Sequence, residues 1–400
     1  MKTRRQPRVL ILIENVPFER DSRVQREAQA LLRAGYGVSV ISPAGDGTLR
    51  AGLEAVRSHH YPAPRDRASR WGYLWEYAYS LVMTLALTIK VSVTERFDVI
   101  QACNPPETGF LVALPFKPLG RRFVFDHHDL SPELFVSRYG AGEGPLYRLL
   151  GWLERASFAT ADHVIATNES VREVALTRGG KAPSQVTIAR NGPWLDEAVR
   201  RPLRPDLRSG RSHLCCWVGV MGKDDGVDLA LQAVSHLARS LLRTDCHFAF
   251  LGDGEERDEL VQLADDLGIS DLVSFPGWVS QSVAFDYLST ADLALCADPA
   301  GPRSNVSTMI KVIEYMALSV PIVSFDVHET MVSAGEAAVY APGNDPAAMA
   351  ELISALLEDP DRRRRMGEVG RRRVEEQLAW DHQQLAYVQV FDRLLDRKAS

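Results

Sequence analysis

The feature that most constrains the fold is a regular alternation of short apolar runs and longer amphipathic segments. Residues 9–13 (VLILI) form a continuous apolar run, which is typical of a strand buried in a parallel sheet. Residues 23–34 follow with apolar side chains at helical spacing, and residues 38–41 are the next apolar run. Because the connections are short, this segment is predicted to be a β-α-β unit of a doubly wound sheet.

The alternation continues in two series. The first predicts further strands at residues 98–102, 122–126 and 163–167. The second predicts strands at 214–220, 247–252, 272–275, 293–296 and 321–325, with helices at 227–240, 255–268 and 308–318. We therefore expect an α/β protein with two Rossmann-like domains, residues 1–195 and 213–378. The Pro- and Arg-rich stretch at 196–212 is predicted to be a linker, and residues 379–400 to form an amphipathic helix.

Composition excludes several classes of protein. Hydrophobic residues make up 46% and charged residues 24%, which is the balance of a globular chain. The net charge of −6 gives no sign of a nucleic-acid partner. Five cysteines without a C-x-x-C spacing indicate neither a disulfide framework nor a zinc site, so we expect a reducing compartment. Residues 9–13 are too short for a signal sequence, and the uncharged apolar stretch 78–89 is too short to span a bilayer.

Residues 305–316 (NVSTMIKVIEYM) carry an unusual polar face. On a helix Ser307, Lys311 and Glu314 share one side, with apolar side chains opposite. The helix start suits a phosphate, with hydroxyls from Ser307 and Thr308. Lys311 adds a positive charge, and Glu314 can accept hydrogen bonds from a ribose diol. The alternative is a helix cap followed by a solvated Lys–Glu pair, and the spacing does not separate the two.

Two glycine-rich turns stand at predicted strand ends. Gly252 and Gly254 lie between a strand and a helix, where they permit a tight turn or the close approach of a ligand. The segment 219–226 (GVMGKDDG) also opens a helix. It lacks the G-K-[ST] sequence of a Walker A loop, so it does not predict an NTPase.

The segment 125–129 (FDHHD) follows the strand at 122–126, at the edge where open α/β sheets bind ligands. Its two His and two Asp are metal-ligand types, but adjacent histidines point apart and no further ligands are placed. We prefer His128 as a contact to a sugar hydroxyl or phosphate. A histidine satisfied by backbone groups is the alternative.

Residues 70–79 (RWGYLWEYAY) are dense in aromatic side chains and follow Arg65 and Arg67. Trp and Tyr near arginines suit a membrane interface or a lipid-linked acceptor. The alternative, which we prefer, is that the aromatics pack a helix on the first sheet, with residues 81–91 as its core face.

Eight segments in order carry a family resemblance. In the first domain they are RDSRVQREAQALLRAGYGVSVI, FDVIQACNPPETG, FDHHDLSPELF and VTIARNGPWLD. In the second they are WVGVMGKDDGVDLALQAV, the set FLGDGEERDEL, VSFPGWV and ADLAL, then STMIKVIEYMALSVPIVSFD and LAWDHQQLAYVQVF. Together they resemble the retaining glycosyltransferases of family 4, specifically a bacterial branch with VGVMG and STMxKxxEYMA motifs. The resemblance implies a GT-B fold, with two domains facing a cleft and the C-terminal helix crossing back to the first.

The resemblance also implies residue roles. Glu314 matches the second Glu of the E-x7-E motif, which contacts the donor ribose. Ser307, Thr308 and Lys311 would hold the diphosphate, and His128 would touch the transferred sugar. The base and ribose side would be lined by Gly252, Gly254, Gly277, Trp278 and Val279. No metal and no cofactor beyond the nucleotide sugar is implied.

Three departures from the family pattern concern the donor. Val306 replaces the first Glu of E-x7-E, and Val220 and Asp225 replace the Arg and Lys of R-x4-K-G. The N-terminal Gly-Gly loop is replaced by residues 16–21. Because the diphosphate charge must still be balanced, Lys223 and Arg303 become candidates beside Lys311, with the backbone of Gly222 nearby.

These features predict a retaining transferase that moves a sugar from a nucleoside diphosphate sugar, with UDP preferred, to a hydroxyl of a glycan, lipid-linked glycan or natural product. Two alternatives stay open: a catalytically weak GT-B subunit that supports a partner transferase, and a nucleotide-sugar epimerase. We expect a cytoplasmic protein with no nucleic-acid partner. Peripheral contact with the inner face of the membrane through residues 65–79 is a further expectation.

Overall fold

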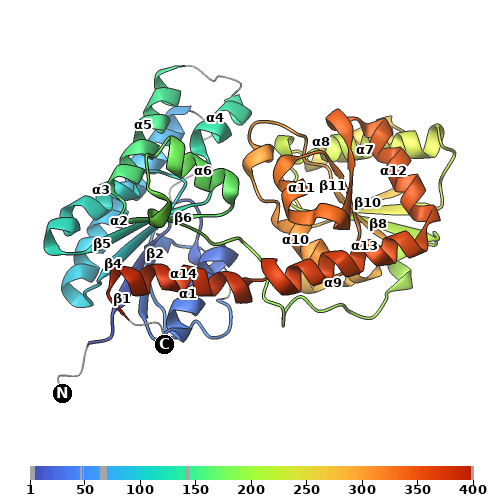
Figure 1. The fold of residues 1–400 in the computed structure, drawn as a ribbon. Coiled ribbons are helices and arrows are strands. Elements are labelled where there is room, and N and C mark those ends of the chain that lie inside the picture. The colour runs from blue at the N-terminus through green and yellow to red at the C-terminus, as the bar shows by residue number, and fades with distance from the viewer. Residues whose placement is uncertain (1–4, 46, 48, 64–69, 140–143, 398–400) are drawn as a thin grey trace. The chain divides into compact units, whose positions relative to one another are not determined.

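The computed structural model describes residues 5–45, 47, 49–63, 70–139 and 144–397, and the chain divides into two compact units (Figure 1). The first unit holds residues 1–190 together with 383–400, and the second holds residues 191–382. Each unit contains one parallel sheet with helices on both faces, so the predicted α/β class with two Rossmann-like domains is confirmed (Figure 1).

The first unit is built on a seven-stranded sheet in the order β3-β2-β1-β4-β5-β6-β7. Its strands are β1 (Arg8–Leu12), β2 (Gly37–Pro43), β3 (Arg57–Tyr61), β4 (Val99–Cys103), β5 (Arg122–His127), β6 (His163–Ala166) and β7 (Val186–Ile188). Its helices are α1 (Ser22–Arg33), α2 (Arg70–Thr94), α3 (Gly109–Ala113), α4 (Ser131–Tyr139), α5 (Pro145–Thr160) and α6 (Glu169–Thr177). The central strands are buried throughout, because helices cover both faces of the sheet.

The second unit repeats the design with a six-stranded sheet in the order β10-β9-β8-β11-β12-β13. Its strands are β8 (His213–Val218), β9 (Cys246–Leu251), β10 (Val273–Gly277), β11 (Leu293–Cys296), β12 (Ile322–Phe325) and β13 (Ala338–Ala341). Its helices are α7 (Val227–Arg239), α8 (Arg257–Asp266), α9 (Gln281–Thr290), α10 (Ile310–Ala317), α11 (His328–Ala334), α12 (Pro346–Glu358) and α13 (Pro360–Arg373). The last helix, α14 (Trp380–Leu394), begins in the second unit and continues in the first.

All the predicted strands are present within a few residues of their expected ends. Three further strands, β3, β7 and β13, were missed. β3 reads RSHHY and lacks an apolar run, while β7 and β13 are only three and four residues long. Such edge strands are fixed by their neighbours in the sheet rather than by their own composition.

The segment predicted as a linker, residues 196–212, is instead packed within the second unit. The backbone N–H of Arg201 donates to Ser289 Oγ at 2.9 Å, and that of Arg204 donates to Thr290 Oγ1 at 2.9 Å. The side chain of Arg208 pairs with Asp292 at 2.9 Å. Its arginines and its backbone are thus used to hold the segment against α9 and the strand that follows.

Helix α14 is tied to the first unit by two phenol hydroxyls. The hydroxyl of Tyr387 donates to Oε1 of Gln101, a buried residue of β4, at 2.6 Å. Tyr36, at the start of β2, donates to Asp392 Oδ1 at 2.6 Å. These contacts explain why residues 383–400 belong to the first unit although they are the last in the sequence.

Helix α2 buries residues of the stretch 81–91, as predicted, but mainly through hydroxyl side chains. Thr84, Thr88 and Val91 are fully buried, and Ser80 one turn earlier is buried with them. Over the described residues, one helical segment, Trp75–Thr94, is long and apolar enough to cross a membrane by length and composition. The stretch 78–89 was judged too short because it stops at Lys90, whereas the helix continues past this charge.

The arginine runs of α13 bind the C-terminal ends of other helices. Arg363 Nη1 donates to two carbonyls in the last turn of α12, Leu356 O and Leu357 O, each at 2.6 Å. Arg371 Nη1 donates to Ala317 O at the end of α10 at 2.6 Å and to Ala198 O at 2.7 Å. Arg373 binds carbonyls in the last turn of α11. These side chains donate to carbonyls in the last turns of helices, where the N–H partners of the helix interior are missing.

We expect Arg371→Ala to lower the free energy of unfolding by about 1–2 kcal/mol, because two charge-assisted hydrogen bonds to buried carbonyls are lost. Arg372→Ala is the matched control, since this neighbouring arginine is exposed. Urea denaturation of both variants provides the measurement. Equal stability of the two variants would contradict the capping role.

Candidate functional site

Both sheets change winding direction between two central strands, and this is where their polar residues gather. In the first sheet the change falls between β1 and β4, and in the second between β8 and β11. Connections leave neighbouring strands there in opposite directions, which opens a crevice at the carboxyl edge. Each unit therefore has one such edge at which a ligand can bind.

In the second unit, Lys311 reaches the switch point from the first turn of α10. Its Nζ lies 2.8 Å from Asp298 Oδ2, just beyond β11, and 3.8 Å from Asp225 Oδ1. The same atom is 4.8 Å from the centre of the buried Trp217 ring of β8. Burial lowers the pKa of Lys311, but the Asp298 carboxylate outweighs it, so the pKa lies above its ordinary value. The ammonium is thus charged and held in place.

The other predicted residues of this helix lie as follows. Helix α10 begins at Ile310, so Ser307 and Thr308 precede it instead of forming its first turn. Ser307 Oγ donates to the Arg303 carbonyl at 2.9 Å. Glu314 is half-buried one turn beyond Lys311, while the apolar side chains of the opposite face are buried, as the spacing predicted.

The cations proposed to balance a diphosphate all have carboxylate partners in this chain. Arg303 Nη1 lies 2.8 Å from Asp224 Oδ2, and the exposed Lys223 lies 3.8 Å from Glu256. Asp225 accepts from the backbone N–H of Gly222 at 3.2 Å. Burial raises the pKa of Asp225, and Lys311 opposes the rise. These cations are already paired with carboxylates. A bound anion would therefore have to share the cations with those carboxylates or displace them.

The glycines assigned to the base and ribose side have a packing role. A Cβ on Gly252, whose φ is +140°, would lie 1.8 Å from Gly219 O, and a Cβ on Gly254 would lie 2.5 Å from Met221 O. The turn after β9 thus packs backbone to backbone on the loop after β8. Steric fit between these loops accounts for both glycines whether or not a ligand approaches them.

Three predicted residues lie at the end of β10. Gly277 has a φ of +79° and faces open space, so a side chain there would be strained but would not clash. Trp278 is 77% exposed, which is unusual for the largest aromatic side chain and leaves its ring available for stacking. Val279 packs partly against the core.

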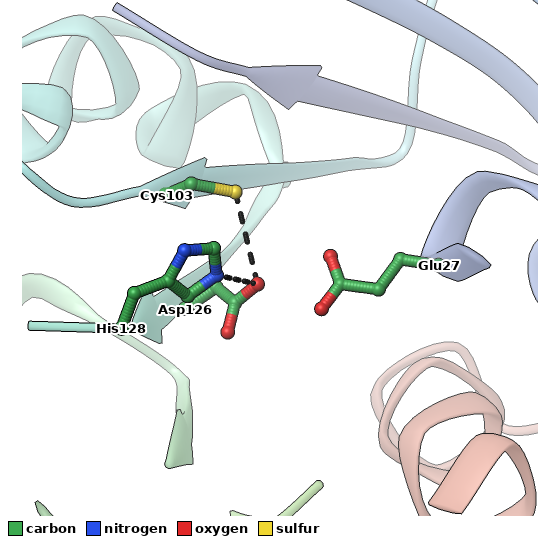
Figure 2. A group of neighbouring side chains, drawn as sticks. All are labelled: Glu27, Cys103, Asp126 and His128. Atoms are coloured by element: carbon green, nitrogen blue, oxygen red, sulfur yellow. Dashed lines mark hydrogen bonds and ion pairs between the residues drawn. The ribbon is translucent and has the colours of Figure 1, made fainter. Parts of the chain in front are cut away.

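In the first unit, His128 stands at one end of a buried polar cluster that the sequence did not predict (Figure 2). His128 Nε2 lies 2.8 Å from Asp126 Oδ2 and 2.9 Å from Arg23 Nε. Arg23 also pairs with Asp126 at 3.0 Å and with Glu27 at 2.9 Å. Gln101 Nε2 donates to both Glu27 and Asp126, at 2.8 and 2.9 Å. These residues come from α1, β4 and β5.

Adjacent histidines point apart, as expected. His127 lies on the other side of the strand, where its ring stacks on Phe125 and meets Phe158 edge-on. Burial lowers its pKa to about 3, so it stays neutral in the core. Of the two histidines, only His128 therefore lies on the side of the polar cluster.

Charges in the cluster are divided unequally. Burial and the neighbouring Asp126 raise the pKa of Glu27 well above its ordinary value. Burial opposes ionisation of Asp126, but Arg23 and His128 outweigh it, so its pKa is lowered. The two carboxyl groups of the cluster therefore differ, since the pKa of Glu27 is raised while Arg23 and His128 lower that of Asp126. This arrangement fixes the His128 ring from one side.

The ligand types of this cluster also bear on a metal. Glu27, Cys103, Asp126 and His128 offer ligand atoms that lie within 4.8 Å of one another (Figure 2). However, Arg23 already places a cation at hydrogen-bonding distance from three of the four, and the Gln101 amide occupies both carboxylates. Burial and nearby acids raise the pKa of the Cys103 thiol, so the thiolate is disfavoured. The donor set is therefore that of an arginine site rather than a metal site.

The switch point of the first sheet holds two polar residues, Glu14 and Asn104, that sequence reasoning missed. Glu14 follows β1 and accepts from Thr108 Oγ1 at 3.1 Å, while its Oε1 is buried without a hydrogen-bond partner among the described residues. Asn104 follows β4, accepts from the His128 N–H at 2.6 Å and donates to Glu107 at 2.9 Å. Their place directly after two central strands was the signal that could have found them.

Comparison with known proteins agrees with this geometry. Residues 21–192 match a model described as "Glycosyl transferase 4-like domain", and residues 212–359 match one described as "Glycosyl transferases group 1". An alpha-D-kanosaminyltransferase of Streptomyces kanamyceticus is 25% identical over 54% of this chain and 56% of that protein. A D-inositol 3-phosphate glycosyltransferase of Thermomonospora curvata is 29% identical over 67% of this chain and 64% of that protein. The chain thus spans less than two thirds of these two relatives.

Solved structures show the same fold. A sucrose-phosphate synthase from Thermosynechococcus elongatus superposes with a TM-score of 0.79 at 18% identity, over 98% of this chain and 100% of that one. HepE of Anabaena, solved in complex with UDP, superposes with a TM-score of 0.73 at 16% identity, over 97% and 100%. Two parallel sheets with this strand order define the GT-B class. Within that class, the chain belongs to the glycosyltransferases of the family 4 type.

The buried Glu14 carboxyl predicts a pH dependence of stability. Burial raises its pKa to about 7, while the Thr108 hydrogen bond opposes the rise, and the ordinary value is 4.5. As pH rises from 4.5 to about 7, the unfolded chain therefore ionises this group before the folded chain does, and stability falls.

We expect Glu14→Gln to remove up to about 3 kcal/mol of this loss, because the amide stays neutral. Urea unfolding of both proteins at about pH 5 and about pH 8 provides the measurement. The exposed Glu351→Gln is the control. An unchanged pH dependence in Glu14→Gln would show that Glu14 is already ionised in the folded chain.

Proposed function

We propose that this chain transfers a glycosyl group from a nucleoside diphosphate sugar to a hydroxyl acceptor, with retention of anomeric configuration. The observation that carries the proposal is the buried ammonium of Lys311. Asp298 holds it at the switch point of the second sheet, and Ser307 and Thr308 lie shortly before it in the sequence. HepE has been solved with UDP and with UDP-glucose. UDP is therefore the first nucleotide to test.

The second unit supplies the groups that such a donor requires. Among the residues that the structure describes, no side chain caps the N-terminus of α10, so its first N–H groups can face the diphosphate. Lys311 adds a fixed positive charge, and Glu314 is placed one turn further for the ribose diol. The exposed Trp278 provides a surface on which the base can stack.

The proposed reaction balances without a further reactant. The bond from the anomeric carbon to the diphosphate oxygen breaks, and a bond to the acceptor oxygen forms on the same face. The acceptor proton passes to the leaving diphosphate, whose charge Lys311 and the α10 amides stabilise. The donor brings no cofactor into this scheme, and it uses no metal ion.

The first unit is assigned to the sugar and the acceptor. His128 is held by Asp126, Arg23 and the Asn104 amide, so little side-chain entropy is lost when it contacts a sugar hydroxyl. Glu14, buried with one unpartnered oxygen at the same edge, is the group that we assign to an acceptor hydroxyl.

The diphosphate must compete with the carboxylates around Lys311. Asp298 lies closer to Nζ than Asp225 does, at 2.8 Å against 3.8 Å. We infer that Asp298 stays in place and keeps the ammonium aligned, while Asp225 gives way to the roughly two negative charges of the donor. Asp225 stands where the family pattern has a lysine, so its charge opposes donor binding.

This charge pattern also favours a second candidate function. If the carboxylates keep Lys311 and Arg303 occupied, the chain is a GT-B subunit with little donor affinity that supports a partner transferase. The expected contact of residues 65–79 with a membrane falls largely outside the described residues, whose side chains resume at Trp75. A cytoplasmic location, with that peripheral contact, remains part of the proposal.

We expect Lys311→Ala and Glu314→Ala each to lower kcat/KM at least tenfold, about 1.4 kcal/mol of barrier, because charge and ribose contacts are lost. Arg365→Ala and Glu351→Ala remove matched charges from exposed positions on α13 and α12 and serve as controls. Transfer from UDP-glucose to the acceptor is the measurement, with circular dichroism to establish folding. Wild-type rates in both site variants would contradict the assignment.

Thermal shift with UDP, GDP, dTDP and ADP, each with and without EDTA, tests the donor site itself. A nucleotide at 100 times its Kd adds about 2.7 kcal/mol of stability. We expect one nucleotide to raise Tm regardless of EDTA, and Asp225→Asn to bind it more tightly. No shift in the wild type together with a shift in Asp225→Asn would favour the partner-subunit function.

A further inference from the structure

Helix α2 is amphipathic, but its polar face is buried and its apolar face is exposed. Its buried positions Ser80, Thr84 and Thr88 lie four residues apart on one face and carry hydroxyls. Helix α2 contacts β2 and β3, so this buried hydroxyl face is directed at the sheet. Helix α2 therefore packs on the sheet through its hydroxyl face and leaves its other side to solvent.

The apolar side of the same helix is exposed. Trp75, Val82, Ile89 and Val93 are 60%, 64%, 53% and 76% exposed, and they fall at intervals of seven, seven and four residues. This spacing places them in one stripe along the helix. A surface helix of a globular domain normally shows the opposite pattern, with its apolar stripe in the core.

Neighbouring helices extend this surface. Helix α3 contacts both α2 and α5, and the buried Phe110 of α3 meets Trp152 of α5 edge-on at 6.2 Å. Leu111 on α3, and Leu114 and Leu119 on the 3-10 turn that follows it, are exposed. On α5, Leu149 and Trp152 are exposed as well. Isolated exposed apolar residues are ordinary, but a stripe with neighbours on two adjoining helices marks an interaction surface.

The charges around this surface are of one sign. Lys90 on α2 and Arg148 and Arg155 on α5 are exposed. Over the described side chains of α2, α3, the following turn and α5, the only carboxylates are Glu76, which is half-buried, and Glu154, which is buried. The chain as a whole carries a net charge of −6, so the positive charge of this rim is opposite in sign to the net charge of the molecule.

We propose that the face formed by α2, α3 and α5 docks on the surface of an anionic lipid bilayer. Apolar stripes that carry Trp and are flanked by Lys and Arg suit the boundary between headgroups and acyl chains, and the absence of exposed carboxylates suits a negative surface. Although Trp75–Thr94 has the length and composition of a membrane span, its hydroxyl face is packed on the sheet. The helix therefore lies along the membrane rather than across it.

This surface shares Trp75 with the aromatic segment 70–79 but extends well beyond it. It is centred on residues 82–93, 111–119 and 149–155, and it does not depend on the donor chemistry of the second unit. A lipid surface also fits the class of acceptor that would reach the first unit from a membrane, namely a lipid-linked hydroxyl compound.

Sedimentation of the full chain with vesicles tests the proposal. We expect the wild type to bind vesicles of phosphatidylcholine with phosphatidylglycerol at about 0.1 M salt, and to bind pure phosphatidylcholine much more weakly. Val82→Asp/Ile89→Asp should reduce binding at least about tenfold, because two charges enter the stripe. Lys90→Glu/Arg155→Glu should remove the preference for the anionic vesicles.

Leu242→Asp is the matched control, since Leu242 is 82% exposed and belongs to the second unit. Both altered sites are exposed, and thermal melts will show whether the variants fold. Three results would overturn the proposal: no wild-type binding to anionic vesicles, unchanged binding by Val82→Asp/Ile89→Asp, or a wild-type dimer in sedimentation velocity that this double variant makes monomeric. The last result would assign the face to a second copy of the chain.

Discussion

The structure depends on one constraint: a parallel sheet covered by helices on both faces leaves only its strand ends for polar chemistry. Both units meet this constraint with the same strand order, so each has one switch point between two central strands. The buried strands there are apolar almost throughout, yet the residues directly beyond them include Glu14, Asn104 and Asp298. The polar sites of the two units therefore lie at equivalent places, beyond the carboxyl ends of the strands at the switch point of each sheet.

Charge is handled differently at the two positions. In the first unit, Arg23 pairs with Asp126 and with Glu27, whose pKa is raised by burial, which gives a closed cluster that fixes His128. In the second unit, carboxylates surround Lys311, and one of them, Asp225, lies at a longer distance with a raised pKa. Buried ion pairs contribute little net stability when complete, but they hold a charge in a defined place. The closed cluster of the first unit suits the positioning of His128. The carboxylates around Lys311 in the second unit suit exchange with an anionic ligand.

Much of the fold could be predicted from the sequence because buried parallel strands are continuous apolar runs. The placing of Lys311 and Glu314 on one side of α10 was predictable from helical spacing, whereas Ser307 lies before the helix and does not share this face by that rule. The partners were not predictable: Lys311 and Asp298 are on different elements, and the Arg23 cluster joins three elements and reaches Tyr387 in α14 through Gln101.

Some errors have a common physical origin. The glycines of the turn after β9 are explained by backbone packing on Gly219 and Met221, which no local pattern shows. Helix α2 buries Ser80, Thr84 and Thr88 against the sheet, a hydroxyl face that the apolar composition of the segment does not indicate. Residues 196–212 have the composition of a linker, but their arginines bind α9 and its surroundings. In each case tertiary contacts outweighed local composition.

The central claim is that a nucleoside diphosphate binds the second unit at the start of α10. Hydrogen–deuterium exchange of the full chain with and without UDP, resolved by mass spectrometry, tests it most directly. The account predicts slower exchange in peptides covering residues 307–312 and 219–226, with little change in the first unit's β4 and β5. Protection confined to other segments at saturating UDP would contradict the claim.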